Sequence, residues 1–357
     1  MKRLFAAELL LCLCLYAAGA FAEIGFAEVR MDNVNVRKSP GGDMRWQLDA
    51  GASVYVYEES MRGDTLWCRV YTNAGGKDTV SGWIRGDMLR FVSEEFTDVL
   101  RVEAGYQYVT GVRRGGSVAI IGWDMPHLKC IDKVHAWENV VKTSSQICTV
   151  FGLDAEDNVL HAGRFGTYEG QKAYDFYGNT PVLLNEDGSF TPFMRERLAE
   201  QYGLAEGLLN GQYIEAHDTQ AQLFLLTKEG KVYHGTGGEG YTELFGDGLR
   251  TVDIDIHWTN LLALKEDGTV RSRGPHGRGA AAVDGWTNVV KIASGEVFSL
   301  ALRGDGTVYY AGDDTAFAER VKGWKDVVDL DAGDGFAIAL FADGHVEMAG
   351  RFESYDR

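Results

Sequence analysis

Apolar residues recur at a fixed interval along most of this chain. Two copies begin at Trp286 and Trp324 and read Trp-Thr-Asn-Val-Val-Lys-Ile-Ala-Ser-Gly and Trp-Lys-Asp-Val-Val-Asp-Leu-Asp-Ala-Gly. A second marker follows each start, as in Ala301-Leu-Arg-Gly-Asp-Gly-Thr-Val308. Apolar side chains two residues apart face one side of a strand, and Asp-Gly between two such stretches marks a tight hairpin. The pattern therefore predicts short strands joined by tight turns.

The second marker occurs seven times, and its main apolar column holds Val112, Leu153, Leu184, Leu226, Leu264, Leu302 and Leu340. A single repeat cannot bury both faces of its strands, whereas radial packing of seven such sheets can. We therefore predict an all-β fold with a seven-bladed β-propeller at residues 96–357. A linear β-solenoid is the alternative, but its repeats are usually shorter.

The third copy of the repeat is irregular. Its segment Phe193–Tyr202 has helical spacing, with Leu198 and Tyr202 four residues apart. We predict a short helix on the outer part of that blade.

Residues 26–92 lack the repeat and alternate short apolar strands with glycine turns, which predicts a small β-barrel. Its Asn35-Val-Arg37 start, Gly51-Ala-Ser-Val54 hairpin, Trp67-Cys-Arg-Val70 strand and Gly82-Trp-Ile84 end resemble a bacterial SH3-type domain. The resemblance implies binding of cell-wall peptides, or simple packing beside a partner domain. Five aromatic side chains either line a groove or fill the barrel core: Trp46, Tyr55, Tyr57, Trp67 and Trp83.

The first 22 residues have the pattern of a secretory signal. Lys2 and Arg3 precede a short apolar run, and Ala20-Phe-Ala22 is a small-x-small cleavage site. The run is shorter than the roughly 20 residues that a membrane span needs, and no later segment is apolar enough. We therefore predict a mature chain without a membrane span that is secreted or associated with the cell surface.

The chain is strongly acidic, with 52 acidic and 35 basic residues and a net charge of −17. Such a surface repels phosphate backbones and anionic lipid, so we expect neither nucleic acid nor a membrane surface as partner.

With the charge and the export signal established, the repeat itself can be compared with known families. The run Trp-x-Asn-Val-Val-Lys-Ile-Ala-x-Gly followed by Ala-Leu-x-x-Asp-Gly-Thr-Val resembles the regulator-of-chromosome-condensation repeat family. The founding eukaryotic members are nuclear exchange factors for a small GTPase, a function that we do not expect of an exported, acidic chain. Bacterial relatives are mostly secreted. Some of them, such as a β-lactamase-inhibiting propeller, bind other proteins with loops on one face.

Several motifs that suggest a cofactor fit the repeat instead. Gly235-Thr-Gly-Gly-Glu-Gly240 matches a dinucleotide fingerprint, but it occupies the slot of Ala311-Gly-Asp313 after the third strand of a copy. Asp329, Asp331 and Asp334 suggest a calcium loop, but a twelfth-position carboxylate is missing. We interpret them as solvated strand residues, and we expect no nucleotide, metal or other cofactor.

Histidine and cysteine also fail to predict a metal site. His127, Cys130 and His135 lack a fourth ligand at zinc spacing, and His257 follows Asp253 and Asp255 on a repeat strand. The mature chain keeps three cysteines, Cys68, Cys130 and Cys148. Cys130 and Cys148 either form one bridge or are buried thiols.

The turn between the first two strands of each blade is the place that we predict for binding. Its columns vary, and they carry the aromatic residues Tyr106, Tyr108, Trp258, Phe298 and Phe336. Loop-borne aromatic residues make good anchors for a partner. The alternative is that these rings cap the propeller channel.

We expect no catalytic residues, because the chain has no nucleophile elbow, phosphate loop or His-Glu-x-x-His motif. The predicted function is a monomeric, secreted binding protein whose partner is a protein or a cell-wall glycan or peptide. An inhibitor of an extracellular enzyme is one alternative. A glycan hydrolase is the other, because a pair of carboxylates can form in space without any sequence signature.

Overall fold

The computed structural model describes residues 25–350, apart from 73–79, 107, 124–128, 147–148, 165–167, 169, 178–180, 220–221, 237–239 and 274–281. The predicted signal, residues 1–22, lies outside the described residues. The described part is all-β with a few short helices. None of its helices has both the length and the apolar character that a membrane crossing requires.

The N-terminal module is one seven-stranded antiparallel sheet with the strand order β3-β2-β6-β5-β4-β1-β7. Its strands are β1 (Gly25–Val29), β2 (Val34–Arg37), β3 (Met44–Leu48), β4 (Ser53–Arg62), β5 (Thr65–Thr72), β6 (Val80–Arg85) and β7 (Leu89–Phe91). A 3-10 turn, η1 (Gly86–Met88), precedes β7, and the short helix α2 (Val92–Glu95) leads out of the module. The sheet spans residues 25–91, and the domain bounds 26–92 and 96–357 stay a prediction.

Seven smaller sheets follow in the described residues, each built from consecutive strands. Sheet 1 comprises β8 (Val99–Ala104), β9 (Tyr108–Arg113) and β10 (Val118–Gly122). Sheet 2 comprises β11 (Val140–Gln146), β12 (Thr149–Asp154) and β13 (Val159–Gly163). Sheet 3 comprises β14 (Asp175–Tyr177) and β15 (Val182–Leu184). Sheet 4 comprises β16 (Tyr213–Thr219), β17 (Gln222–Thr227), β18 (Val232–Thr236) and β19 (Gly240–Leu244). Sheet 5 comprises β20 (Thr251–His257), β21 (Asn260–Lys265) and β22 (Val270–Arg273). Sheet 6 comprises β23 (Val289–Ser294), β24 (Phe298–Arg303) and β25 (Val308–Gly312). Sheet 7 comprises β26 (Val327–Ala332), β27 (Phe336–Phe341) and β28 (Val346–Gly350).

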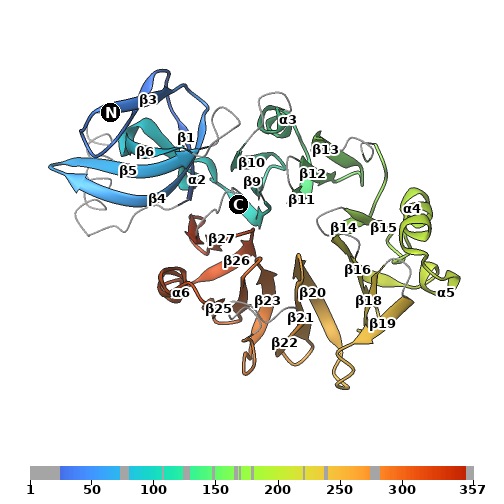
Figure 1. The fold of residues 1–357 in the computed structure, drawn as a ribbon. Helices are drawn as coiled ribbons and strands as arrows, with labels where there is room; N and C mark the ends of the chain where they lie inside the picture. Colours follow the sequence, from blue (N-terminus) through green and yellow to red (C-terminus); the bar gives the residue numbers. More distant parts are fainter. Residues whose placement is uncertain are drawn as a thin grey trace.

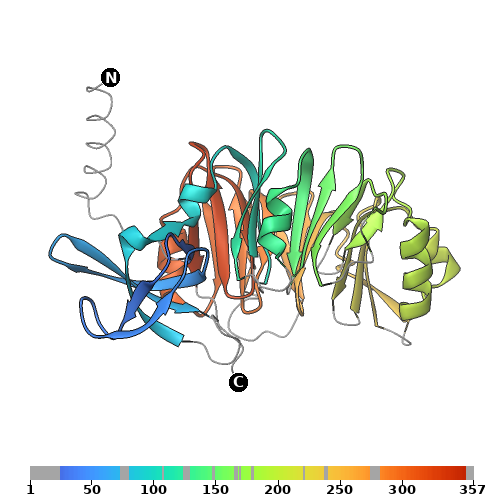
Figure 2. The ribbon, with the colours of Figure 1, turned by 90° about the horizontal axis from the view of Figure 1, so that it is seen from above.

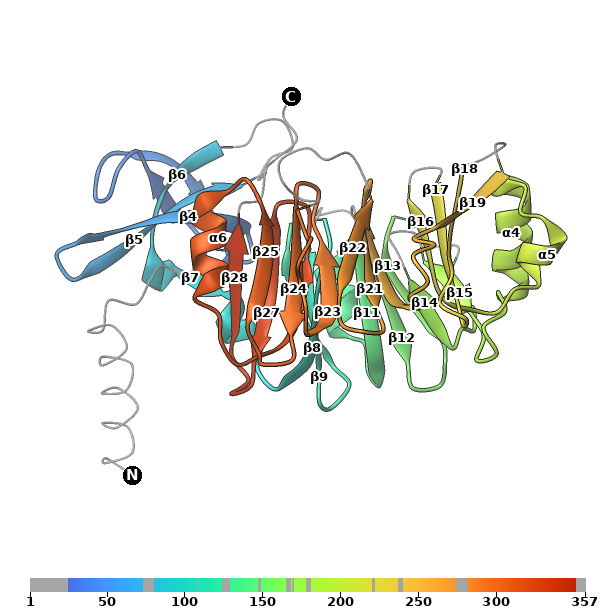
Figure 3. The same ribbon diagram turned by 90° about the horizontal axis from the view of Figure 1, so that it is seen from below.

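The sheets stand around a common centre, which is the arrangement of a β-propeller (Figure 1). Seen edge-on, their strands run through the thickness of the ring, and the N-terminal module is attached at one edge (Figures 2 and 3). The first strand of each sheet is the innermost one, because residues of these strands line the central cavity.

The helices lie on the outside of the ring (Figure 1). They are α3 (Cys130–His135), α4 (Pro192–Tyr202), α5 (Glu206–Leu209) and α6 (Thr315–Lys322). Helix α4 confirms the helix predicted in the third copy, and it buries Met194, Leu198 and Tyr202 against sheets 3 and 4. The third repeat therefore replaces an outer strand with a helix.

A bulge occurs at the start of the first strand in six of the seven sheets, where the strand pairing shifts by one residue. In sheet 6 the shift falls between Val289 and Lys291, so Val290 has no partner in the ladder. Asn288 precedes the Val289-Val290 pair and has a φ of 58°. This is a left-handed conformation that Asn and Asp tolerate better than other side chains. This explains the Asn or Asp that precedes Val-Val in the repeat.

The N-terminal module packs directly on sheets 1 and 7. Phe26 lies edge-on to Phe336 with ring centres 5.4 Å apart, and the Tyr55 hydroxyl donates to the Gly350 carbonyl oxygen at 3.1 Å. Tyr71 makes an edge contact with Trp123 at 6.0 Å. Because Phe26, Tyr55 and Phe336 are completely buried, the module and the propeller share one apolar core.

Candidate functional site

An apolar ring surrounds the central channel on one face of the propeller. It consists of the bulge residue of each innermost strand and, in sheet 3, the residue just before β14: Leu100, Val141, Tyr174, Ile214, Val252, Val290 and Val328. Six of these side chains are between 37% and 58% exposed, and Ile214 is half-buried. In the described part of the propeller, no other large apolar side chain is exposed to this degree. In the described part of the propeller, this one repeated position therefore supplies the large apolar side chains that are most exposed.

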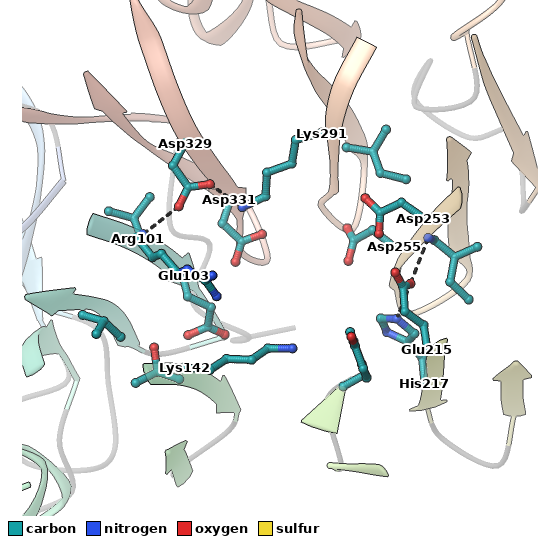
Figure 4. A pocket seen from close by; sticks show the side chains of 16 residues that line it. Arg101, Glu103, Lys142, Glu215, His217, Asp253, Asp255, Lys291, Asp329 and Asp331 are labelled. Atoms are coloured by element: carbon teal, nitrogen blue, oxygen red, sulfur yellow. Dashed lines mark hydrogen bonds and ion pairs between the residues drawn. The ribbon is translucent and has the colours of Figure 1, made fainter. Parts of the chain in front are cut away.

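The residue after each ring member is charged in all seven sheets, and all of these residues except Asp175 line the central cavity: Arg101, Lys142, Asp175, Glu215, Asp253, Lys291 and Asp329. Two residues further along, five sheets carry Glu103, Tyr177, His217, Asp255 and Asp331. Together with neighbouring residues they line a central cavity of about 240 Å³ (Figure 4). Six carboxylates face three lysine or arginine side chains around it.

Carboxylates of one sheet accept backbone N–H groups of the next sheet around the channel. Asp329 Oδ2 accepts from the Val102 nitrogen at 3.0 Å, and Asp331 Oδ2 accepts from the Ala104 nitrogen at 2.8 Å. These two bonds join sheet 7 to sheet 1. No strand is shared between those two sheets in the described chain, so the acidic side chains help to close the ring.

The same arrangement joins other neighbours. The Ser145 nitrogen donates to Glu103 Oε1 at 2.8 Å, and the Ile254 nitrogen donates to Glu215 Oε2 at 2.9 Å. Asp255 Oδ2 accepts from both the nitrogen and the hydroxyl of Ser294 at 2.5 and 2.7 Å. The channel charges therefore have a structural role in addition to any binding role.

Two lysines bridge further pairs of sheets. Lys291 Nζ lies 2.5 Å from Asp329 Oδ1, and Lys142 Nζ lies 2.8 Å from Asp175 Oδ1. Lys142 also lies over the Tyr177 ring, 3.8 Å from its centre. These contacts place both ammonium groups against partners in the next sheet.

Burial changes the proton affinity of the channel acids. It raises the pKa of Glu103 and of Glu215 to about 7, although hydrogen bonds to each carboxylate oppose the shift. Burial, together with the charge of Glu215, also raises the pKa of Asp253 well above its usual value. Burial lowers the pKa of His217, which favours the neutral ring. The cavity carboxylates outnumber the lysine and arginine side chains around them, and the most buried carboxyl groups keep their protons to a higher pH than usual.

The structure separates the five aromatic residues that we predicted for binding. Tyr108, Phe298 and Phe336 are at most 2% exposed and pack inside or between sheets, with Phe336 in the interface with the N-terminal module. Tyr106 and Trp258 are partly exposed, so they are the two members that a partner can reach. Binding by this set stays a prediction.

The aromatic residues of the N-terminal module are mostly buried as well. Tyr55 is completely buried, and Trp67 and Trp83 are at most 9% exposed, which fits their interpretation as core. Trp46 and Tyr57 are half-buried, and Tyr57 packs against the interface with the propeller.

Asp329, Asp331 and Asp334 were expected to be solvated strand residues, and this expectation was wrong. Asp329 and Asp334 are 9% and 3% exposed, and Asp331 accepts the Ala104 nitrogen inside the channel. Asp334 lies 3.3 Å from His257 Nε2. The innermost strand β26 turns Asp329 and Asp331 towards the axis of the ring, whereas Asp334 lies in the turn that follows this strand. Among the described residues, no three Asp, Glu, His or Cys side chains are grouped closely enough to hold a metal ion.

Two other sequence motifs fall partly outside the described residues. Gly235 and Gly240 lie on β18 and β19, which pair as an antiparallel hairpin instead of leading into a helix as a dinucleotide site requires. Cys68 and Cys130 are buried. His127 and Cys148 are not described, so the zinc set and the Cys130–Cys148 bridge stay untested.

Sequence reasoning missed both the apolar ring and the channel charges. The available signal was the Val-Val pair followed by a charged residue, as in Val289-Val-Lys291. Two adjacent apolar residues cannot both face the same side of a regular strand, so the pair indicated either a bulge or an exposed side chain. A charged residue at that position in every repeat indicated a shared, polar environment.

Comparisons with known proteins do not assign this chain to a family. No family model matches the chain, and no curated protein matches it. Among solved structures, the ectodomain of the receptor kinase CR4 from Physcomitrella patens is 14% identical, with a TM-score of 0.49 over 70% of this chain and 72% of that chain. Yeast RCC1 (Prp20), solved with Kap60, is 15% identical, with a TM-score of 0.40 over 71% and 70%. Human WBSCR16 is 12% identical, with a TM-score of 0.40 over 92% and 88%. At these values the similarities define neither a family nor a function.

Proposed function

We propose that this chain is a non-catalytic binding protein whose propeller holds a protein partner on the face that carries the apolar ring. The observation that supports this proposal is the concentration of exposed apolar side chains at one repeated position. Monomeric proteins rarely gather exposed apolar residues in this way without a binding role. Val290 and Val328, more than half exposed on neighbouring sheets, are central to the surface.

The ring face is also hollowed. Leu100 and Val141 border a depression of about 380 Å³ between sheets 1 and 2, beside Arg113 and Arg114. Arg101 lines both this depression and the central cavity, so the two hollows are neighbours. Arginine is enriched in protein interfaces, so Arg113 and Arg114 beside exposed apolar side chains fit a protein partner.

The test compares Val290→Thr/Val328→Thr with Met61→Thr as a matched control, because Met61 is also exposed but belongs to the N-terminal module. A partner is captured from culture supernatant with the wild-type chain, purified, and titrated against all three proteins. We expect the double variant to bind at least about tenfold more weakly, since fully buried anchors contribute most of the binding energy. Equal binding by wild type and double variant would refute the ring as the docking face.

We further propose that the seven sheets are the seven blades of the repeat and that the N-terminal sheet is a bacterial SH3-like barrel. Export by the segment 1–22 and association with the cell wall belong to the same proposal. A depression of about 190 Å³ on the N-terminal module supports wall binding, because Arg37 borders it beside Trp67 and suits a peptide carboxylate. Arg85 also borders it but is paired with Asp87. Sedimentation of the full chain with purified peptidoglycan, compared with Arg37→Gln, tests this part.

The two alternatives make different predictions in the same assays. A captured partner that is an extracellular enzyme, and that loses activity on binding, would make this chain an inhibitor. Turnover of a glycan panel would instead favour a hydrolase. The cavity of about 240 Å³ is smaller than the roughly 300–1,000 Å³ of most sites for extended ligands, which disfavours a sugar chain.

A further inference from the structure

Three acidic side chains gather on one wall of the central cavity. Glu215, Asp253 and Asp255 lie on the adjoining strands β16 and β20 and line the cavity together (Figure 4). Among the described residues, no lysine or arginine forms an ion pair with these three carboxylates. The two cavity lysines are held elsewhere, by Asp329 and Asp175.

A buried histidine on the same wall has an unused ring nitrogen. The His217 side chain is 7% exposed, and its Nε2 has no hydrogen-bond partner among the described residues. This atom lies 3.6 Å from Glu215 Oε2, which is beyond a hydrogen bond. A buried imidazole nitrogen left without a partner is costly, unless a ligand or water supplies one.

The protonation of the wall is consistent with a missing cation. Burial raises the pKa of Glu215 to about 7, and it raises the pKa of Asp253 well above its usual value. A cation placed between these groups would reverse the shift, because an opposite charge at close range favours the ionised carboxylate.

The geometry favours an organic cation over a metal ion. Glu215 and Asp255 each use an oxygen to hold a backbone N–H of the next sheet, and the Asp253 side chain is hydrogen-bonded to Glu215, so few carboxylate oxygens are left to converge on a metal ion. A primary ammonium carries three N–H donors on a narrow stem. Such a group can reach two carboxylates and an imidazole on this wall, and its alkyl stem suits the apolar ring above.

We propose that the central cavity binds a primary alkylammonium group on the wall formed by Glu215, His217, Asp253 and Asp255. The group is either the end of a lysine side chain on a docked protein or a free alkylamine. The chemistry at the wall is the same for both sources. The inference does not depend on the protein partner proposed above, because a free amine is sufficient to test it.

The experiment titrates the full chain at pH 8 with n-butylamine, with 1-butanol as the uncharged control and with tetramethylammonium as a cation without N–H donors. Binding is followed by calorimetry and by the ¹⁵N imidazole signal of His217, assigned with His217→Asn. We expect saturable binding of butylamine alone and a shifted His217 signal. We expect Glu215→Gln/Asp255→Asn to weaken binding about tenfold or more, since charged hydrogen bonds are lost, while the control Glu243→Gln on β19 binds like wild type.

A second arm identifies the source of the amine. The peptide acetyl-Ala-Ala-Lys-Ala-Ala-amide is compared with butylamine on wild type and on Val290→Thr/Val328→Thr. Tighter peptide binding that depends on the two valines assigns the site to a protein lysine. If the peptide and butylamine bind equally, and the valine substitutions change neither affinity, the site is assigned to a free amine.

Three outcomes overturn the inference. The first is that neither amine binds to the folded full chain. The second is that tetramethylammonium binds as well as butylamine, which would show that binding needs no N–H donors. The third is that Ca²⁺ or Mg²⁺ shifts the His217 signal while butylamine does not. Failure of the amine leaves the ring proposal standing, because the ring is tested with a whole protein partner.

Discussion

Replacing Glu215 with glutamine changes how the stability of this protein depends on pH. Glu215 Oε2 accepts the Ile254 nitrogen at 2.9 Å, and burial raises the pKa of this side chain from an ordinary 4.5 to about 7. Glutamine keeps the acceptor for Ile254 and carries no titrating proton. The substitution therefore removes the charge while it preserves the contact.

The sign follows from proton binding in the two states. Between pH 4.5 and about 7 the folded protein binds a proton at Glu215 that the unfolded chain has released. The free energy of unfolding of the wild type therefore falls as pH rises through this window. At about 1.4 kcal/mol per pH unit, the loss for this one group is about 3 kcal/mol and is complete by about pH 8.

The assay is urea unfolding of wild type and Glu215→Gln from pH 5 to pH 8, followed by tryptophan fluorescence. Relative to wild type, the variant should gain about 2.5 kcal/mol between pH 5 and pH 8, because the assay samples the window from pH 5 to about 7. His217 acts with the opposite sign, because its pKa is lowered and its stabilising contribution is lost as pH falls below 6.5. It is present in both proteins, so most of its effect cancels in the difference. The pKa of Asp253 falls in the variant, because the charge of Glu215 helps to raise it in wild type.

The control is Glu243→Gln, because Glu243 pairs with Lys231 on the surface and is substantially exposed. Its unfolding free energy should run parallel to that of wild type across the pH range. Parallel curves for Glu215→Gln as well would refute the assignment of a raised pKa to Glu215. They would also weaken the case for an ammonium site on this wall of the cavity.

Three further substitutions test other parts of the structure. Asp329→Ala leaves the Val102 N–H without its acceptor and should lower the free energy of urea unfolding by about 1–3 kcal/mol, with Asp329→Asn closer to wild type; equal effects would argue against ring closure by this bond. Phe26→Ala empties the interface with the N-terminal module, which should cost about 3–5 kcal/mol and split the calorimetric transition in two; one unchanged transition would contradict a shared core. Val290→Thr/Val328→Thr should change stability by no more than about 0.5 kcal/mol per residue in the same urea assay, because both side chains are exposed; a larger loss would show that they are packed.

The strands and their order could be predicted from the sequence because they depend on local patterns. Asp-Gly hairpins and apolar columns such as that of Leu302 specify pairing between strands that follow one another along the chain. The helix at Phe193–Tyr202 also follows from local spacing, with Leu198 and Tyr202 on its buried side. Each of these signals lies within a few residues of the element that it specifies.

The candidate site could not be predicted in the same way, because it depends on contacts between repeats. Val290 resembles a core residue until the bulge at the strand start is known. Asp331 resembles a solvated residue until β8 of the first sheet, with Ala104, is placed beside it. Phe336 resembles a loop anchor until the N-terminal module docks there, with Phe26 against its ring. All three depend on the closed ring, which no short segment encodes.

The docking of the N-terminal module has a consequence for how the chain is made. Tyr55 bonds to Gly350, 295 residues later, and Phe26 packs on Phe336. The module can complete its own sheet soon after synthesis, but the surface that covers its aromatic face is produced last. Until then an incomplete chain carries an exposed aromatic patch, which favours aggregation. Joining such distant segments is slow, so docking is expected to be the final folding step. A chain that stops before sheet 7 would lose both the closing sheet and the cover for its first domain.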